Sequence, residues 1–326
     1  MKILVLTLLF VSTLVVADDK WTITIENNPD IKKHDLTSVF VAGKTAFAVG
    51  KKGTILQYKD SVWRVFDRVT AQDLNGVCVD LIEGEGTTGY NVAVVGNQGT
   101  ILYYYKNLPM TPELKEMIGD EYQEDTNEEK WKVMNSGTQQ NLHSVSCSIS
   151  YIIAVGDQGT ALSFAPSDPE DGWEKLQSNS QADLISVCTT AESFLAVGKK
   201  GTILRYKEFS WKSIENLQTN TQSIYSDGLA TYILTNNTLS SYNTKKRIPT
   251  PKDLHNYEAF FKLGDHLFLS GSNNQKEISL QSHYDNSWKL LNSGSTINSI
   301  HGNSNLIFAV GNNGVILKIT PRKNVK

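Results

Sequence analysis

The sequence is short of arginine and cysteine, and each shortage argues against a class of protein. Only five arginines occur and the net charge is −3, so the basic excess that nucleic-acid binding requires is missing. Three cysteines are too few, and odd in number, for a disulfide framework. Cys78, Cys147 and Cys188 lie in apolar stretches, and we expect all three to be buried free thiols.

Long apolar runs are missing after the first residues. Met1-Lys2 precedes an apolar run from Ile3 to Val16, and Ala17 stands before two aspartates. This pattern is typical of a secretory signal peptide at residues 1–17, and the run is too short to cross a bilayer. We therefore expect no membrane span. Residues 18–326 should form a single domain that is secreted or lies in the lumen of the secretory pathway.

Motifs for catalysis or for metal and cofactor binding are also missing. The six histidines show no metal-ligand spacing, and no paired carboxylates stand out. A sialidase would need three converging arginines, and Arg247 lies in the most degraded part of the chain. The sequence predicts a protein that is not an enzyme, with no metal site and no cofactor.

What the chain does contain is an internal repeat of the form A-V-G-x-x-G-T-I-L. Its five clear copies are Ala48–Leu56, Val94–Leu102, Ala154–Leu162, Ala196–Leu204 and Ala309–Leu317. An L-x-S-V segment or a variant precedes each copy. A tryptophan opens a short alternating run after the first four copies, at Trp63, Trp131, Trp173 and Trp211. Two weaker copies lie between Trp211 and the last clear copy, one at 222–239 and the other at 259–274, which is followed by Trp288.

Seven units of four short strands each predict an all-β fold, a seven-bladed β-propeller of four-stranded antiparallel blades. The last unit ends without a tryptophan strand, whereas the mature chain begins with one, Trp21–Ile25. The N-terminal strand should therefore complete the last blade and close the ring, which removes an exposed sheet edge.

The G-x-x-G step fits a hairpin loop in which two polar residues form a type I turn and the second glycine is left-handed. On this interpretation Gly53→Val costs more stability than Lys52→Val, since only the glycine has a positive φ.

Two segments interrupt the regular pattern. Residues 106–130 form an acidic loop insertion in the second unit, either a solvated loop or an acidic docking arm. Asn236-Asn237-Thr238 is a glycosylation sequon, so Asn236 is expected to carry a glycan on a surface loop.

The A-V-G-x-x-G-T-I-L core after L-x-S-V resembles the repeats of photosystem II assembly/stability factor propellers. It is also similar to sialidase-type (BNR) repeats. This resemblance covers Trp21 to Ile319 and implies the propeller fold. Those groups include scaffolds, glycan binders and hydrolases. The D-G-G-x-T-W turn of such repeats is degenerate here, as in Lys59–Trp63, so no binding residue carries over.

In a propeller the G-x-x-G turns gather on one face, together with the loops between blades. We expect this face to bind the ligand through hydrogen-bonding side chains. The candidate residues are Lys51, Lys52, Asn97, Gln98, Asp157, Gln158, Lys199, Lys200, Asn273, Asn274, Asn312 and Asn313. The function predicted is a secreted, non-catalytic scaffold that binds another protein. The alternative is a glycan-binding lectin with repeated blade sites, because the same side chains suit sugars.

Overall fold

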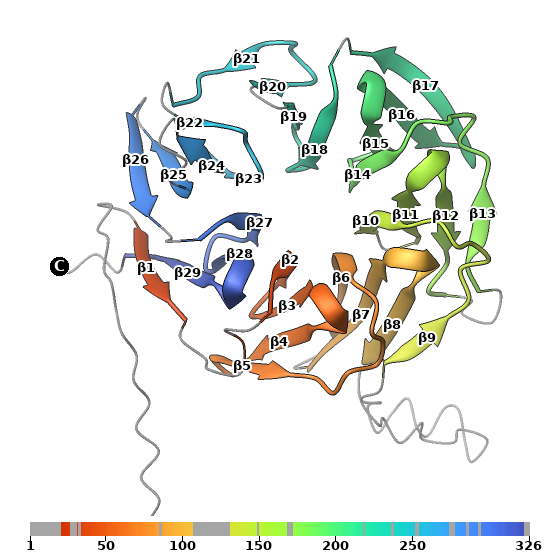
Figure 1. The fold of residues 1–326 in the computed structure, drawn as a ribbon, viewed down its shortest axis with the longest axis horizontal. Coiled ribbons are helices and arrows are strands. Elements are labelled where there is room, and N and C mark those ends of the chain that lie inside the picture. The colour runs from red at the N-terminus through yellow and green to blue at the C-terminus, as the bar shows by residue number, and fades with distance from the viewer. Residues whose placement is uncertain are drawn as a thin grey trace, which may run out of the picture.

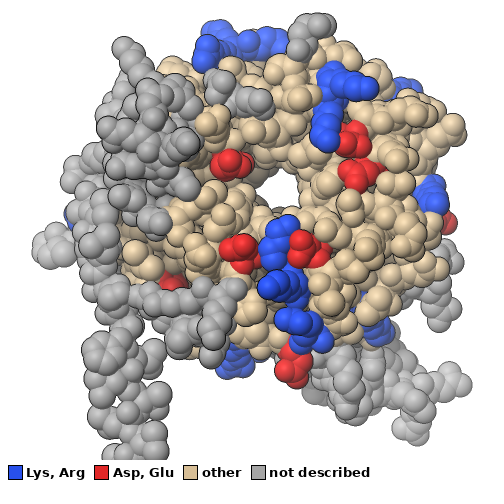
Figure 2. All heavy atoms as spheres, viewed as in Figure 1, with Lys and Arg blue, Asp and Glu red and all other residues tan. Residues whose placement is uncertain are grey.

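The computed structural model is a ring of antiparallel sheets (Figure 1) around a central channel, which the space-filling view shows (Figure 2). It describes residues 21–26, 31, 34–84, 87–106, 131–148, 150–167, 172–217, 219–235, 238–251, 254–273, 278–284, 287–292 and 295–322. The only helices in these ranges are single 3₁₀ turns. Among the same residues, no helix has the length and apolarity needed to cross a bilayer. The predicted signal peptide, residues 1–17, lies outside them.

Five consecutive sheets of four strands, here blades I to V, follow the sequence repeat. Blade I contains β2 (Leu36–Ala42), β3 (Thr45–Gly50), β4 (Ile55–Lys59) and β5 (Val62–Val65). Blade II contains β6 (Leu74–Gly84), β7 (Thr87–Gly96), β8 (Ile101–Lys106) and β9 (Lys132–Met134). Blade III contains β10 (Leu142–Cys147), β11 (Ile152–Gly156), β12 (Ala161–Phe164) and β13 (Glu174–Leu176). Blade IV contains β14 (Leu184–Thr189), β15 (Phe194–Gly198), β16 (Thr202–Lys207) and β17 (Ser210–Asn216). Blade V contains β18 (Thr221–Ser226), β19 (Thr231–Thr235), β20 (Thr238–Ser241) and β21 (Arg247–Ile248).

The next sheet departs from the predicted form. It has five strands, β22 (Leu254–His255), β23 (Phe260–Leu263), β24 (His266–Asn273), β25 (Ile278–Tyr284) and β26 (Ser287–Asn292). Both β22 and β23 pair with β24, because the first strand of this unit is broken in two. The prediction of seven four-stranded blades is therefore corrected. Within the described ranges six blades have four strands. This unit, which lacks the L-x-S-V and G-x-x-G signals, forms a five-stranded sheet.

The ring closes as predicted from the chain ends. The closing blade contains β27 (Ile297–Gly302), β28 (Ile307–Gly311), β29 (Ile316–Pro321) and the N-terminal strand β1 (Trp21–Ile25). Strand β1 pairs with β29 along its whole length, from Trp21 opposite Pro321 to Ile25 opposite Leu317. Trp21 and Ile23 are buried and pack with Phe268 of the five-stranded sheet.

The core lies between neighbouring sheets, and the repeat motif supplies it. Ala48 and Val49 of β3 are fully buried, because the second strand of each blade is paired on both edges and covered on both faces. The tryptophan on the outer strand packs on an aromatic ring of strand three. The ring centroids of Tyr206 and Trp211 are 5.2 Å apart in blade IV. The recurrence of these residues is therefore explained by packing between the blades and does not by itself indicate a ligand.

The serine of the L-x-S-V motif joins one blade to the next. The Val187 and Ile224 N–H groups donate to Ser144 Oγ and Ser186 Oγ of the preceding blades, each at 3.2 Å. At the junction of blades II and III the motif has Gly76 in place of serine. Close to that position the structure has a disulfide between Cys78 and Cys147.

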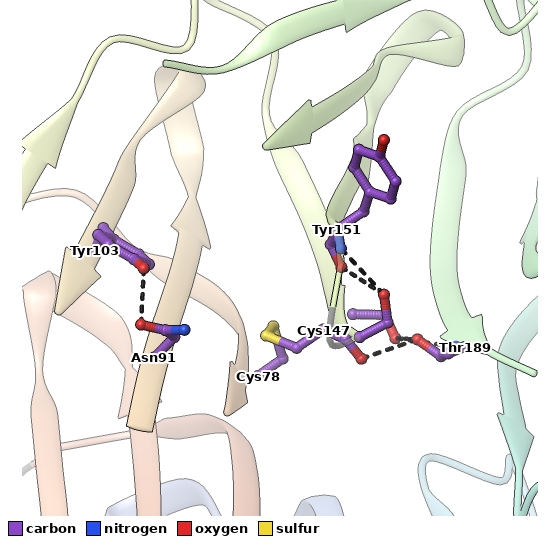
Figure 3. The surroundings of a disulfide bond; sticks show 8 residues. Cys78, Asn91, Tyr103, Cys147, Tyr151 and Thr189 are labelled. Atoms are coloured by element: carbon purple, nitrogen blue, oxygen red, sulfur yellow. Dashed lines mark hydrogen bonds between the residues drawn. A yellow bond between two sulfur atoms is a disulfide. The ribbon is translucent and has the colours of Figure 1, made fainter. Parts of the chain in front are cut away.

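The expectation of three free thiols is therefore wrong for two of them. Cys78 follows Val77 directly, whereas Cys147 lies two residues after Val145. Successive side chains of a strand point to opposite faces, so the two cysteines face each other across the junction. Figure 3 shows this bond beside Thr189, whose hydroxyl donates to the Cys147 carbonyl at 3.0 Å. Cys188, directly after Val187, packs against blade V as a buried free thiol.

The G-x-x-G turns also differ from the prediction. The second polar residue is left-handed as well as the glycine: Lys52 has φ 56° and Gly53 φ 71°. The turn closes in two ways, with Gly50 N–H donating to the Thr54 carbonyl and Thr54 N–H to the Lys51 carbonyl. Both positions have a positive φ, so the prediction that only Gly53 has one is wrong, and the sign of φ does not make Gly53→Val costlier than Lys52→Val. The two positions differ instead in the room for a side chain, because a Cβ at Gly53 would lie 1.8 Å from the Thr70 carbonyl oxygen.

This geometry leads to a revised stability prediction. Gly53→Ala should lower the free energy of unfolding by about 3 kcal/mol or more, because the backbone must move to admit the methyl group. Lys52→Asn is the matched control and should change it by less than about 0.5 kcal/mol, since asparagine accepts the left-handed region. Urea unfolding of the two variants measures the difference. Equal losses would show that the turn is not built as described.

Candidate functional site

The five regular turns gather on one side of the ring, which we call the turn face. They are η1 (Lys51–Gly53), η2 (Asn97–Gly99), η4 (Asp157–Gly159), η5 (Lys199–Gly201) and η6 (Asn312–Gly314). In Figure 1 their coiled ribbons lie in front of the strands. The structure therefore brings together ten of the twelve predicted candidate residues. Asn273 ends strand β24, and Asn274 lies outside the described residues.

Each turn is held by a side chain from the following blade. The N–H of the second turn residue donates to an Asp or Asn oxygen just before the next inner strand. The five pairs, at 2.8 to 3.0 Å, are Lys52–Asp73, Gln98–Asn141, Gln158–Asp183, Lys200–Asn220 and Asn313–Asp35. These N–H groups lower the pKa of Asp73 and Asp183, helped by Lys51 and Lys199 respectively.

As a result, the two polar residues of a turn have different roles. The first is already paired within the fold: Lys51 with Asp73 at 3.0 Å and Lys199 with Asp183 at 2.7 Å. Asp157 accepts from His143 Nε2 at 2.6 Å and from Asn141. The second residue of every turn is exposed. The Gln98 side chain accepts from Gln72 Nε2 at 2.9 Å. Among the described residues, the exposed side chains of the other four second residues make no hydrogen bond, and these are Lys52, Gln158, Lys200 and Asn313.

The turns surround the mouth of the central channel, which is visible at the middle of Figure 2 with charged side chains of both signs beside it. The channel holds about 390 Å³ and is lined by the inner strands. Asn75 and Asn298 near the mouth donate to the Leu142 and Leu36 carbonyls of the next blade. The channel wall is therefore polar and largely satisfied by its own hydrogen bonds.

One ionisable group deep in the channel is held neutral. His301 stacks on Phe40 with ring centroids 4.0 Å apart, and its Nδ1 accepts from the Val41 N–H at 3.0 Å. Burial lowers the pKa of His301 to about 4. The unfolded chain takes up a proton near pH 6.5 and the folded protein only near pH 4, so stability falls as the pH drops through this window.

We therefore expect the free energy of unfolding to fall by about 2–3 kcal/mol on this account between pH 7 and pH 4.5. His301→Gln should lose this part of the pH dependence. Phe40→Leu is the matched control, since it weakens the stacking, destabilises the protein at every pH and keeps the titrating group. Urea unfolding at the two pH values measures both, and an unchanged pH dependence in His301→Gln would contradict the assignment.

The remaining sequence predictions fall partly outside the structure. Asn236 lies outside the described residues, as does the predicted insertion 106–130 apart from Lys106, which ends β8. Within the ranges that are described, no three His, Cys, Asp or Glu side chains come together to hold a metal ion. The turn-holding Asp and Asn residues were missed, although the sequence signal exists. Asp35, Asp73, Asn141 and Asp183 each stand directly before the leucine of an L-x-S-V-type segment.

Comparison with known proteins supports the fold. No family model and no curated protein sequence matches the chain. Among solved structures, the chain is similar to YCF48 from Cyanidioschyzon merolae, with a TM-score of 0.64, 13% identity and coverage of 92% of this chain and 99% of that one. The chain is also similar to YCF48 bound to a D1 peptide, with a TM-score of 0.63, 11% identity and coverage of 97% of this chain and 99% of that one.

The WD40 propeller domain of Doa1 is similar too, with a TM-score of 0.63, 15% identity and coverage of 92% of this chain and 96% of that one. These likenesses show the β-propeller fold. They agree with the resemblance to photosystem II assembly factor propellers at the level of fold. The structures found do not show the resemblance to sialidase-type repeats.

Proposed function

We propose that this protein is a secreted, non-catalytic scaffold that holds another protein on its turn face. The observation that carries the proposal is the array of second turn residues. Five exposed side chains stand around one channel mouth, and each is fixed by a hydrogen bond from its own N–H to the next blade. Preorganised polar groups lose little entropy when they bind a partner. Among the similar propellers, YCF48 has been seen with a bound peptide.

Secretion is part of the proposal. The signal-like segment at residues 1–17 supports it, and the disulfide between Cys78 and Cys147 suits an oxidising compartment. The absence of a catalytic motif in the sequence supports a binding role.

Glycan binding is the second candidate, favoured by the amide side chains of the turns. One observation weakens it. Sugar sites use exposed aromatic rings, but Tyr58 and Tyr206 of the repeat are buried against Trp63 and Trp211. No aromatic residue recurs in the five turns.

A parallel screen on an array of extracellular proteins and a glycan array tests the proposal. We expect protein hits whose binding falls about tenfold or more in the double variant Lys52→Glu with Lys200→Glu, since neither lysine is committed within the fold. Lys51 and Lys199 are unsuitable because their ion pairs hold the turns. Lys44→Glu on the opposite side, in the β2–β3 turn, is the control. Binding to glycans alone would favour the lectin.

A further inference from the structure

A groove lies on the opposite side of the ring, between blades III and V. Two adjoining cavities of about 290 and 250 Å³ lie on either side of the loop Thr190–Ser193, which joins β14 to β15. They share that loop and Lys207 as a common wall. The loop follows the end of β14 remote from Asp183, so the groove is on the face away from the G-x-x-G turns.

One end of the groove is aromatic. Phe209 is 77% exposed and meets the Tyr151 ring edge-on, with centroids 6.2 Å apart. Figure 3 shows the Tyr151 ring extending away from the hydrogen bonds of its own backbone. Tyr206 also lines this cavity.

The backbone at Phe209 is unfavourable for this residue. Glu208 and Phe209 both have positive φ, 53° and 58°, in a hairpin turn that normally selects Asn, Asp or Gly. The equivalent turn of blade I uses Asp60 and Ser61. A bulky aromatic residue at positive φ is strained and gains no burial in return. Such strain is typical of a functional position.

The other end of the groove is basic and carries a second exposed apolar residue. Arg205 and Lys207 stand beside one carboxylate, Glu192, which Lys207 binds at 3.0 Å. Two cations facing one anion leave a net charge of +1. Leu229, 94% exposed, adjoins them. Phe209 and Leu229 are the two most exposed large apolar side chains among the described residues.

We propose that this groove binds an extended segment of a partner protein in which an aromatic or large apolar residue lies about four residues from an Asp or Glu. The apolar residue packs on Phe209 and Tyr151, and the carboxylate pairs with Arg205. Arg205 and Phe209 are four positions apart, which is at most about 13 Å in an extended chain, and this distance sets the spacing in the ligand. The site is distinct from the turn face and can bind a different protein at the same time.

Panning a displayed library of random twelve-residue peptides on the immobilised protein tests this proposal. We expect a consensus with an apolar anchor and an acidic residue about four positions away. Phe209→Ser should lower the affinity of the selected peptides about tenfold, and Arg205→Glu should shift the selected charge from acidic to basic. Lys44→Glu, on the same side of the ring but in blade I, and the turn-face variant Lys52→Glu with Lys200→Glu should bind them as the wild type does.

The absence of an enriched consensus would overturn the groove proposal, as would peptides indifferent to Phe209 and Arg205. Peptides that depend on Lys52 and Lys200 alone would also overturn it while supporting the turn face. Phe209→Ser should not lower the melting temperature, since the side chain is exposed, so a loss of peptide binding in this variant is not a loss of folding.

Discussion

A protein lacking residues 21–25 should have no cooperative unfolding transition. The deletion removes the outer strand of the closing blade, exposes the edge of β29 and takes Trp21 and Ile23 out of the core. The loss of the two side chains alone is worth about 5 kcal/mol, comparable with the whole stability of many domains. Circular dichroism during heating measures the effect.

Adding the missing strand in trans separates failure of closure from general misfolding. A synthetic peptide of residues 21–26 should restore the transition, because β1 contributes only its own pairing and two buried side chains. The same peptide with alanine in place of Trp21 is the control and should not. An unchanged melting temperature in the deleted protein would show that the ring does not depend on β1.

Loss of the disulfide should have the second largest effect. The bond closes a loop of 69 residues between Cys78 and Cys147, so replacing both with serine should lower the free energy of unfolding by about 2–4 kcal/mol. The effect should exceed that at other junctions, since Gly76 supplies no serine hydroxyl to hold blade III. Urea unfolding measures it.

Ser186→Ala is the matched variant at a junction without a disulfide. It removes one hydrogen bond to the Ile224 N–H and should cost about 1 kcal/mol. Thiol titration in denaturant without reductant should find one thiol, Cys188. Three titratable thiols would contradict the crosslink.

The sequence predicted the propeller and its closure because both depend on local repeats. The A-V-G strand and the tryptophan strand have the same partners in blades I to IV, so one unit predicts the others. The N-terminal strand was predictable for the same reason, since Trp21–Ile25 is the piece that the last unit lacks.

Contacts between blades were harder to predict. The pairing of Cys78 with Cys147 depends on which faces of two inner strands meet. It was not predicted, because an odd number of cysteines argued against disulfides. The left-handed φ of Lys52 was missed because it comes from the Asp73 acceptor of the next blade. The break between β22 and β23 was missed because the degenerate unit has no motif that marks its first strand.

Site-specific photo-crosslinking tests most directly whether a partner protein binds the turn face. A photoreactive amino acid is placed at Lys52, at Lys200 or at Lys44 on the opposite side, and each protein is irradiated in the medium of the cells that produce it. We predict that positions 52 and 200 capture the same protein and that position 44 does not. Capture from position 44 alone, or of different proteins from positions 52 and 200, would contradict the assignment of this face.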